Sequence, residues 1–131
     1  MGLNDKCPCG SKIKYKKCCK TYHDGRVAKN ALLLMRSRYC AYATKEYKYI
    51  LTTTHKSTRD DNMENIKLFS NNTKFHNLNI IDFIDGETEA FVTFHVTIFT
   101  DNKDTSFSEK SRFIKEENRW YYVDGKILDN F

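Results

Sequence analysis

The feature that most constrains this chain is a group of four cysteines within thirteen residues near its start. The stretch CPCGSKIKYKKCCK, residues 7–20, contains Cys7, Cys9, Cys18 and Cys19. Adjacent cysteines bond to each other only across a strained peptide, and the usual redox pair has two residues between its thiols. Four thiolates close a tetrahedron around Zn²⁺ and leave no open coordination position. The spacing therefore predicts one structural zinc ion held by these four cysteines.

Two other residues bear on the predicted metal site. His23 follows the second cysteine pair closely, so it is an alternative ligand in place of Cys19. Cys40 falls in a stretch with helical periodicity, where we expect it to be a buried, small apolar residue rather than a ligand.

Positive charge is concentrated beside the cysteines. Residues 1–20 contain six lysines and one acid, Asp5, in a chain of formal net charge +5. Ammonium groups stabilise an anionic zinc–thiolate centre, but such a centre needs fewer than six of them. The excess therefore indicates a basic surface. That surface is expected to consist of Lys12, Lys14, Lys16, Lys17 and Lys20.

The bulk composition is that of an ordinary folded domain with a small appendage. The chain has 131 residues, of which 40% are hydrophobic and 14% aromatic, which is enough for a core. No apolar run approaches the ~18 residues of a membrane span, and the first residues lack the apolar stretch of a signal peptide. We therefore expect a cytoplasmic protein with reduced thiols, which favours metal binding over disulfides.

Downstream of the cysteines, hydrophobic periodicity changes from helical to strand-like near the middle of the chain. Helices are expected over residues 26–45, 46–54 and 61–69, with Asp24 or Gly25 capping the first. Strands are expected over residues 75–85, 88–100, 106–115 and 119–124, with Gly125 ending the last. The long second strand carries aromatics on both faces, so both faces are expected to be covered. Helices followed by an antiparallel sheet predict an α+β fold.

The cysteine-rich stretch resembles the SEC-C motif, a short zinc-binding segment also found at the C-terminal tail of the SecA translocation ATPase. Beside the cysteines, the match includes Gly10, Ser11 and Tyr15. Lys12 stands where the motif usually has a second glycine, so a positive φ at this position would strain it. In SecA the motif contacts the chaperone SecB, whose surface is acidic, and it has been linked to ribosomes. The resemblance implies a protein partner of this kind.

Most of the remaining chain resembles the YchJ family, through LMRSRYCAYATKEYKYILTTTHKSTR, FHNLNI, EKSRF and RWYYVDG. In that family a SEC-C segment precedes a nuclear transport factor two-like domain, a cone of helices against a curved antiparallel sheet. The resemblance implies a SEC-C segment over residues 1–23 and a cone-shaped α+β domain over residues 24–131. The family usually has Trp-His-Pro where this chain has Thr54-His55-Lys56, and a tryptophan where Phe75 stands, which thins the aromatic lining of any pocket.

A pocket between helices and curved sheet is the second candidate site. Strand alternation places Glu109 and Ser111 on one face, and related cone-shaped domains include isomerases and dehydratases that use an acid or base inside the cone. An ion pair of Glu109 with Arg36 or Arg38 is the structural alternative. Spacing alone assembles no set of nucleophile and base, so no catalytic residue is assigned. The candidate pocket residues are Arg36, Tyr39, His55, His95, Glu109, Ser111, Trp120 and Tyr122.

These features favour a zinc-binding adaptor, whose basic knuckle binds a protein partner such as a SecB-type chaperone or the ribosome. One alternative is a small-molecule carrier or enzyme that uses Glu109. Another is nucleic-acid binding through the lysines and Tyr15, although residues 1–25 contain no arginine, the better bidentate reader of phosphate. A homodimer formed through the open face of the sheet is a further expectation.

Overall fold

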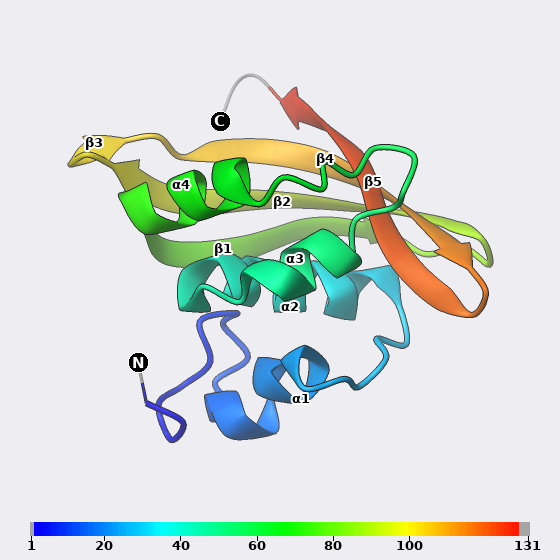
Figure 1. Ribbon diagram of the computed structural model, residues 1–131, viewed down its shortest axis with the longest axis horizontal. Helices are drawn as coiled ribbons and strands as arrows, with labels where there is room; N and C mark the ends of the chain where they lie inside the picture. Colours follow the sequence, from blue (N-terminus) through cyan, green and yellow to red (C-terminus); the bar gives the residue numbers. More distant parts are fainter. Residues whose placement is uncertain (1, 129–131) are drawn as a thin grey trace.

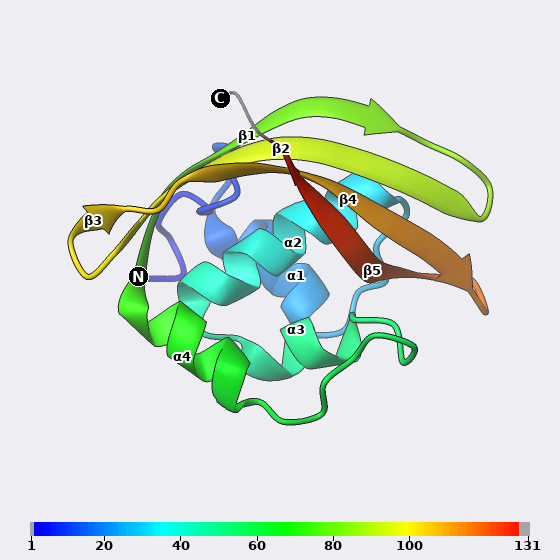
Figure 2. The same cartoon turned by 90° about the horizontal axis from the view of Figure 1, so that it is seen from above.

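The computed structural model describes residues 2–128, in which five strands form one antiparallel sheet that curves around the helices (Figures 1 and 2). The strands are β1 (Thr73–Ile84), β2 (Glu89–Thr100), β3 (Lys103–Asp104), β4 (Phe107–Glu116) and β5 (Arg119–Leu128). Their order is β1-β2-β4-β5, and the short β3 pairs with β2. Each long strand thus lies beside the next long strand in sequence, as hairpin connections require.

The helices lie on the concave side of this sheet (Figure 2). They are the 3₁₀ turn η1 (Tyr15–Lys17), α1 (Cys19–His23), α2 (Ala31–Thr44), α3 (Tyr47–Thr52) and α4 (Glu64–Asn72). No helix within the described residues is long and apolar enough to cross a membrane. The predicted α+β fold is confirmed, with the N-terminal knuckle, residues 2–23, packed beneath α2 (Figure 1).

The central helix α2 is buried on two sides. Leu34, Met35 and Tyr39 belong to the core shared with the sheet, whereas Cys40 packs with the cysteines of the knuckle. The side chain of Asn30 accepts a hydrogen bond of 2.8 Å from the N–H of Leu33, as an N-cap does. The helix therefore begins after Asn30, and the expected start near residue 26 was too early.

The inner face of β2 supplies much of the core. Ala90, Val92, Phe94, Val96 and Ile98 are all at most 6% exposed, which is the period-two pattern expected from the sequence. The outer residues of the same strand are only partly buried, and the described helices all lie on the other side of the sheet (Figure 2). The expectation that both faces are covered was therefore wrong.

Strand β5 is longer than expected. It continues through Gly125 to Leu128, and Gly125 is paired with Ser111 of β4. Glycine usually weakens a strand unless something approaches it closely. Here the carboxylate of Glu109 occupies the space where a Cβ of residue 125 would lie. Gly125 therefore leaves room for the carboxylate of Glu109, and the strand does not end at this residue.

Candidate metal centre and adjoining surfaces

The sulfurs of Cys7, Cys9, Cys18 and Cys19 come together in one cluster. All four lie within 4.8 Å of one another, and the sulfurs of Cys9 and Cys18 are 3.6 Å apart. A tetrahedral zinc site with Zn–S bonds of ≈2.3 Å has sulfurs roughly 3.8 Å apart. Three of the cysteines are buried and Cys18 is partly buried. This geometry and an all-thiolate donor set fit one tetrahedral metal ion.

A short hairpin brings the first cysteine pair to the cluster. Lys6 and Lys14 form an isolated antiparallel bridge on either side of the turn. Within the turn, Gly10 has φ 84° and Lys12 has φ 68°. Lys12 therefore adopts the left-handed conformation in which the motif usually has glycine, at a cost of about 1 kcal/mol.

Two further side chains touch the sulfurs. The hydroxyl of Ser11 lies 3.1 Å from Cys18 Sγ, and Cys40 Sγ, fully buried, lies 3.5 Å from Cys7 Sγ. Hydrogen bonds from the thiols of Cys19 and Cys40 lower the pKa of the Cys7 thiol well below its ordinary value, while burial raises the pKa of Cys18 to about 11. Cys40 is buried as expected, but it also contacts the cluster, which sequence reasoning missed.

His23 links the knuckle to α2 and is not placed as a ligand. Its Nδ1 lies 2.7 Å from the hydroxyl of Tyr15, and its Nε2 lies 2.9 Å from the backbone carbonyl of Ser37. A carbonyl only accepts hydrogen bonds, so Nε2 carries the proton and Nδ1 accepts from Tyr15. Because both ring nitrogens are engaged, the alternative assignment of His23 in place of Cys19 was wrong.

Arg36 reaches the knuckle instead of the cone. Its Nη1 donates a hydrogen bond of 2.7 Å to the carbonyl oxygen of Cys9, so its expected position in the cone pocket was wrong. Arg36, Cys40 and Thr44 recur every four residues and therefore share one face of α2. This spacing is a signal in the sequence that α2 has a second, partly polar packing face.

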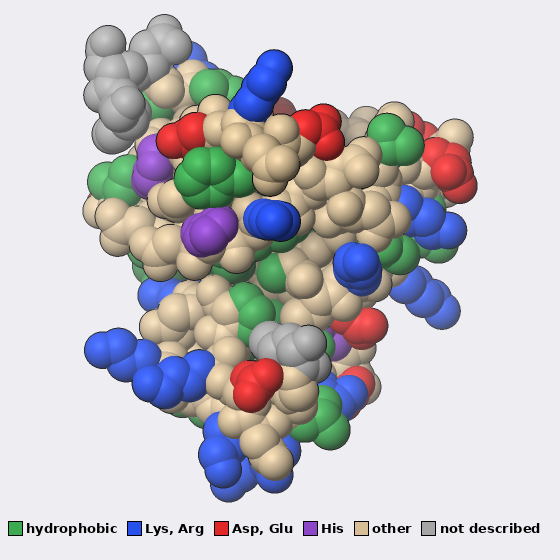
Figure 3. All heavy atoms as spheres, turned by 90° about the vertical axis from the view of Figure 1, so that its left-hand side faces the viewer, with side chains coloured by type: hydrophobic (Ala, Val, Ile, Leu, Met, Phe, Trp, Pro, Cys, Tyr) green, Lys and Arg blue, Asp and Glu red, His purple; other side chains and the backbone are tan. Residues whose placement is uncertain are grey.

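The lysines of the knuckle form an exposed basic surface. Lys12, Lys14, Lys16 and Lys17 are exposed, whereas Lys20 is partly buried and lies 3.1 Å from the carboxylate of Asp24. Figure 3 shows lysine and arginine side chains gathered at the lower end of the molecule, where the knuckle lies in Figure 1. Four of the five predicted lysines are thus available to a partner without breaking an ion pair.

The cone contains a partly open cavity of about 160 Å³. Of the predicted pocket residues, Tyr39, Glu109, Ser111 and Tyr122 line it. The carboxylate of Glu109 accepts hydrogen bonds from the hydroxyls of Ser111 and, at 3.5 Å, Tyr122. Gly125 leaves room for that carboxylate because it has no Cβ. The cavity therefore combines mostly aromatic walls with one oriented carboxylate.

Arg38, and not Arg36, is the arginine at the cone. Its Nη1 donates hydrogen bonds to the hydroxyls of Thr53 and Thr54, and its guanidinium lies 4.7 Å from the centre of the Tyr122 ring. Within residues 2–128, Glu109 forms no ion pair. The alternative in which Glu109 pairs with an arginine was therefore wrong, because Arg38 is held against α3 and its C-terminal end.

Three predicted pocket residues lie elsewhere. His95 is on the outer face of β2, where its Nδ1 is 2.7 Å from the hydroxyl of Ser108. His55 follows α3, and its Nε2 is 2.9 Å from the carboxylate of Glu116 at the end of β4. Trp120 lies at the start of β5, away from the cone cavity. Their expected positions in the cone were wrong, because His95 lies on the outer face of its strand and the other two residues lie outside the lining of the cavity.

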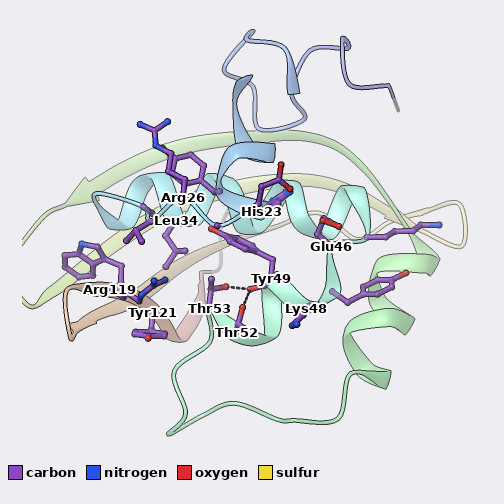
Figure 4. A pocket seen from close by; sticks show the side chains of 18 of the residues that line it. His23, Arg26, Leu34, Glu46, Lys48, Tyr49, Thr52, Thr53, Arg119 and Tyr121 are labelled. Carbon is purple, nitrogen blue, oxygen red and sulfur yellow. Dashed lines mark hydrogen bonds between the residues drawn. The ribbon is translucent and has the colours of Figure 1, made fainter. Parts of the chain in front are cut away.

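A second hollow, larger than the cone cavity, lies between the knuckle and the helix-and-sheet domain, and Figure 4 shows it from close by. This junction groove has a volume of about 750 Å³ and is lined by the end of α1 and the segment after it, by α3, and by the start of β5. Tyr22, Tyr49, Trp120 and Tyr121 contribute aromatic surface to it. Sequence reasoning missed the groove because its walls come from segments far apart in the chain.

Both parts of the chain match known protein families. The profile described as "YchJ, middle NTF2-like domain" matches residues 30–125, and the SEC-C motif matches residues 4–20. A UPF0225 protein of Enterobacter sp. (strain 638) is 39% identical over 124 residues, which cover 91% of this chain and 81% of that protein. A UPF0225 protein of Yersinia pseudotuberculosis serotype I (strain IP32953) is 38% identical over 130 residues, covering 94% and 84%.

Two solved structures share the whole architecture. The solution structure of a SEC-C motif containing protein from Rhodopseudomonas palustris is 30% identical, with a TM-score of 0.87 over 95% of this chain and 100% of that one. The crystal structure of a SEC-C motif containing protein from Psychrobacter arcticus, 24% identical, has a TM-score of 0.84 over 100% and 88%, which supports the fold. The chain therefore belongs to the YchJ family, in which a SEC-C motif precedes an NTF2-like domain.

Proposed function

We propose that this protein is a zinc-binding adaptor, whose knuckle presents a basic surface to an acidic protein partner. One Zn²⁺ held by Cys7, Cys9, Cys18 and Cys19 would cross-link the hairpin to α1, a role that four protein ligands suit because they leave no position for a substrate. The observation that carries the proposal is that exposed lysines surround a four-sulfur cluster with metal-site geometry.

The chemistry of the knuckle suits recognition by charge. The lysines repel one another, so they do not stabilise the knuckle itself. Together, however, they attract an acidic surface and raise the rate of association with it. The metal would hold the backbone that carries them, because binding free energy at a structural zinc site is also folding free energy. Resemblance to the SecA tail suggests a SecB-type chaperone or the ribosome as the partner.

Titration of the zinc-loaded protein with SecB and with ribosomes, at about 0.05 M and about 0.3 M salt, tests this proposal. We expect saturable binding to one of them that weakens as salt screens the charges. The variant Lys16→Glu/Lys17→Glu should weaken it about tenfold or more. The control Lys74→Glu/Lys126→Glu changes net charge equally, at exposed positions outside the knuckle. No saturable binding to either partner overturns the proposal.

A second candidate function is binding of a small molecule with a protonated amine inside the cone. It is supported by the position of Glu109, which two hydroxyls orient within a mostly aromatic cavity that Arg38 also lines. A carboxylate beside aromatic rings is a suitable site for an ammonium group. Native mass spectrometry of freshly purified protein should then show a retained small molecule that Glu109→Gln loses. Protein that carries metal but no further mass would contradict this candidate.

A further inference from the structure

Positive charge surrounds the junction groove without acidic partners. The cations that line the groove are Arg26, Lys45, Lys48, Lys67 and Arg119. In the described part of the chain none of these five forms an ion pair. The groove has only two acids, and one of them, Asp24, is paired with Lys20. The groove therefore has an excess of uncompensated positive charge.

Aromatic side chains form the walls between these charges. Tyr22 and Trp120 are 8% and 6% exposed, and Tyr49 is fixed by a hydrogen bond of 2.7 Å between its hydroxyl and that of Ser37. The guanidinium of Arg26 lies 5.2 Å from the centre of the Tyr22 ring, so a ring holds this cation where no acid does. Figure 4 shows Arg26, from the segment after α1, Lys48 and Tyr49, from α3, and Arg119, from β5, arranged around the hollow.

We infer that the junction groove is a docking site for an acidic, extended peptide segment that carries an aromatic or aliphatic side chain. The inference rests on the proposed function, since it names the part of an acidic partner that the protein holds. Cations spread over several elements match carboxylates spaced along a chain, and the aromatic walls match an apolar side chain between them. The volume of about 750 Å³ lies within the range of roughly 300–1,000 Å³ of ligand sites.

A peptide fits this groove better than a compact phosphate does. Phosphates favour helix N-termini, where several N–H groups and the helix dipole converge. The helix that begins at the groove, α3, has Glu46 at its N-cap, and this carboxylate would repel a dense negative charge. Carboxylates spaced along a peptide can avoid Glu46 while they contact Lys48 and Arg119.

Trp120 provides a direct test, because it is the only tryptophan of the chain and lines the groove. The probe is acetyl-Glu-Glu-Phe-Glu-Glu-amide, added to the zinc-loaded full chain while tryptophan fluorescence is recorded. We expect a saturable change whose midpoint moves at least about tenfold higher between about 0.05 M and about 0.3 M salt. The same peptide with glutamine in place of glutamate should produce no saturable change. An unchanged signal with the acidic peptide overturns the inference.

Charge-reversed variants locate the site. Lys48→Glu/Arg119→Glu should raise the midpoint about tenfold or more, whereas the control Lys74→Glu/Lys126→Glu changes net charge equally at positions outside the groove. Equal effects of the two pairs would mean general attraction only and would overturn the inference. An oligothymidylate of similar charge that binds while the peptide does not would overturn it in favour of nucleic acid.

The same variants separate this inference from the proposed function. If SecB or the ribosome binds, and Lys16→Glu/Lys17→Glu weakens that binding while Lys48→Glu/Arg119→Glu does not, the adaptor function stands and the groove inference fails. If the acidic peptide binds in the groove but neither partner binds, the groove stands as a peptide-binding site and the proposed function is overturned.

Discussion

His23 occupies a position where protonation opposes folding. Its ring connects the Tyr15 hydroxyl to the Ser37 carbonyl and packs on the ring of Tyr49 at 4.8 Å between centres. Burial lowers its pKa below the ordinary histidine value. The unfolded chain therefore binds a proton more readily than the folded one. The contribution of this residue to the free energy of unfolding is fully present above the ordinary histidine pKa. It is lost as the pH falls toward the lowered pKa of the folded protein.

The prediction is that the free energy of unfolding falls as pH decreases from about 7.5 to about 6, and that His23→Gln flattens this dependence. Glutamine offers one acceptor and one donor but does not titrate. Urea unfolding of both proteins at each pH measures the difference, with metal content checked at every point because acid also displaces metal from thiolates. Identical pH dependence in both proteins would contradict the assigned role of His23.

Gly125 is the other residue whose identity is dictated by a neighbour. A methyl group at this position would collide with the carboxylate of Glu109. We expect Gly125→Ala to lower the free energy of unfolding by about 1–3 kcal/mol, because the carboxylate would have to leave its place beside Ser111. The double variant Gly125→Ala/Glu109→Ala should lose less free energy of unfolding than the losses of the two single variants added together. Denaturant unfolding of the original protein, the two single variants and the double variant would measure this. Additive effects would contradict the collision.

At the scale of elements, the start of α2 depends on the side chain of Asn30. Its amide oxygen accepts from the N–H of Leu33, one of the donors at the helix start that lack partners in the helix. Asn30→Ala should lower the free energy of unfolding by about 1 kcal/mol, as measured by urea denaturation, whereas Asn30→Asp keeps an acceptor and should cost less. Equal losses in both variants would show that the cap contributes little.

The helix α2 and the strands also show which features could be predicted from the sequence. Short-range patterns predicted the cysteine cluster, the two kinds of periodicity and the inward face of β2, because each depends on neighbours within a few residues. The direction of Arg36 and the contact of Cys40 with Cys7 depend on how the knuckle folds back beneath α2. The glycine within β5 is explained by Glu109, which lies across the sheet. Resemblance to the YchJ family predicted the architecture, but it did not indicate the junction groove.

At the scale of the whole molecule, the knuckle has far fewer buried residues of its own than the sheet and its helices. The main core joins α2 to the inner face of the sheet, with residues such as Val92 and Phe113 almost fully buried. In the knuckle, the cysteines and Tyr15 form a small cluster with Cys40 of α2, and Tyr22 joins the main core. Its polar ties to α2 include the hydrogen bonds from Arg36 to Cys9 and between His23 and Ser37.

Removal of the metal should therefore unfold the knuckle and leave the sheet intact. Hydrogen bonds contribute about 1 kcal/mol each, so loss of the two ties would lower the thermal midpoint of the remaining domain by roughly 5–10 °C. Cys9→Ser should lose metal and show this shift, with strand signal retained in circular dichroism. Cys40→Ala is the matched control, because it removes a buried thiol beside the cluster but none of the four ligands, and its native mass should still include one zinc. Full unfolding of Cys9→Ser, or loss of metal in Cys40→Ala, would mean that the knuckle and the domain share one core.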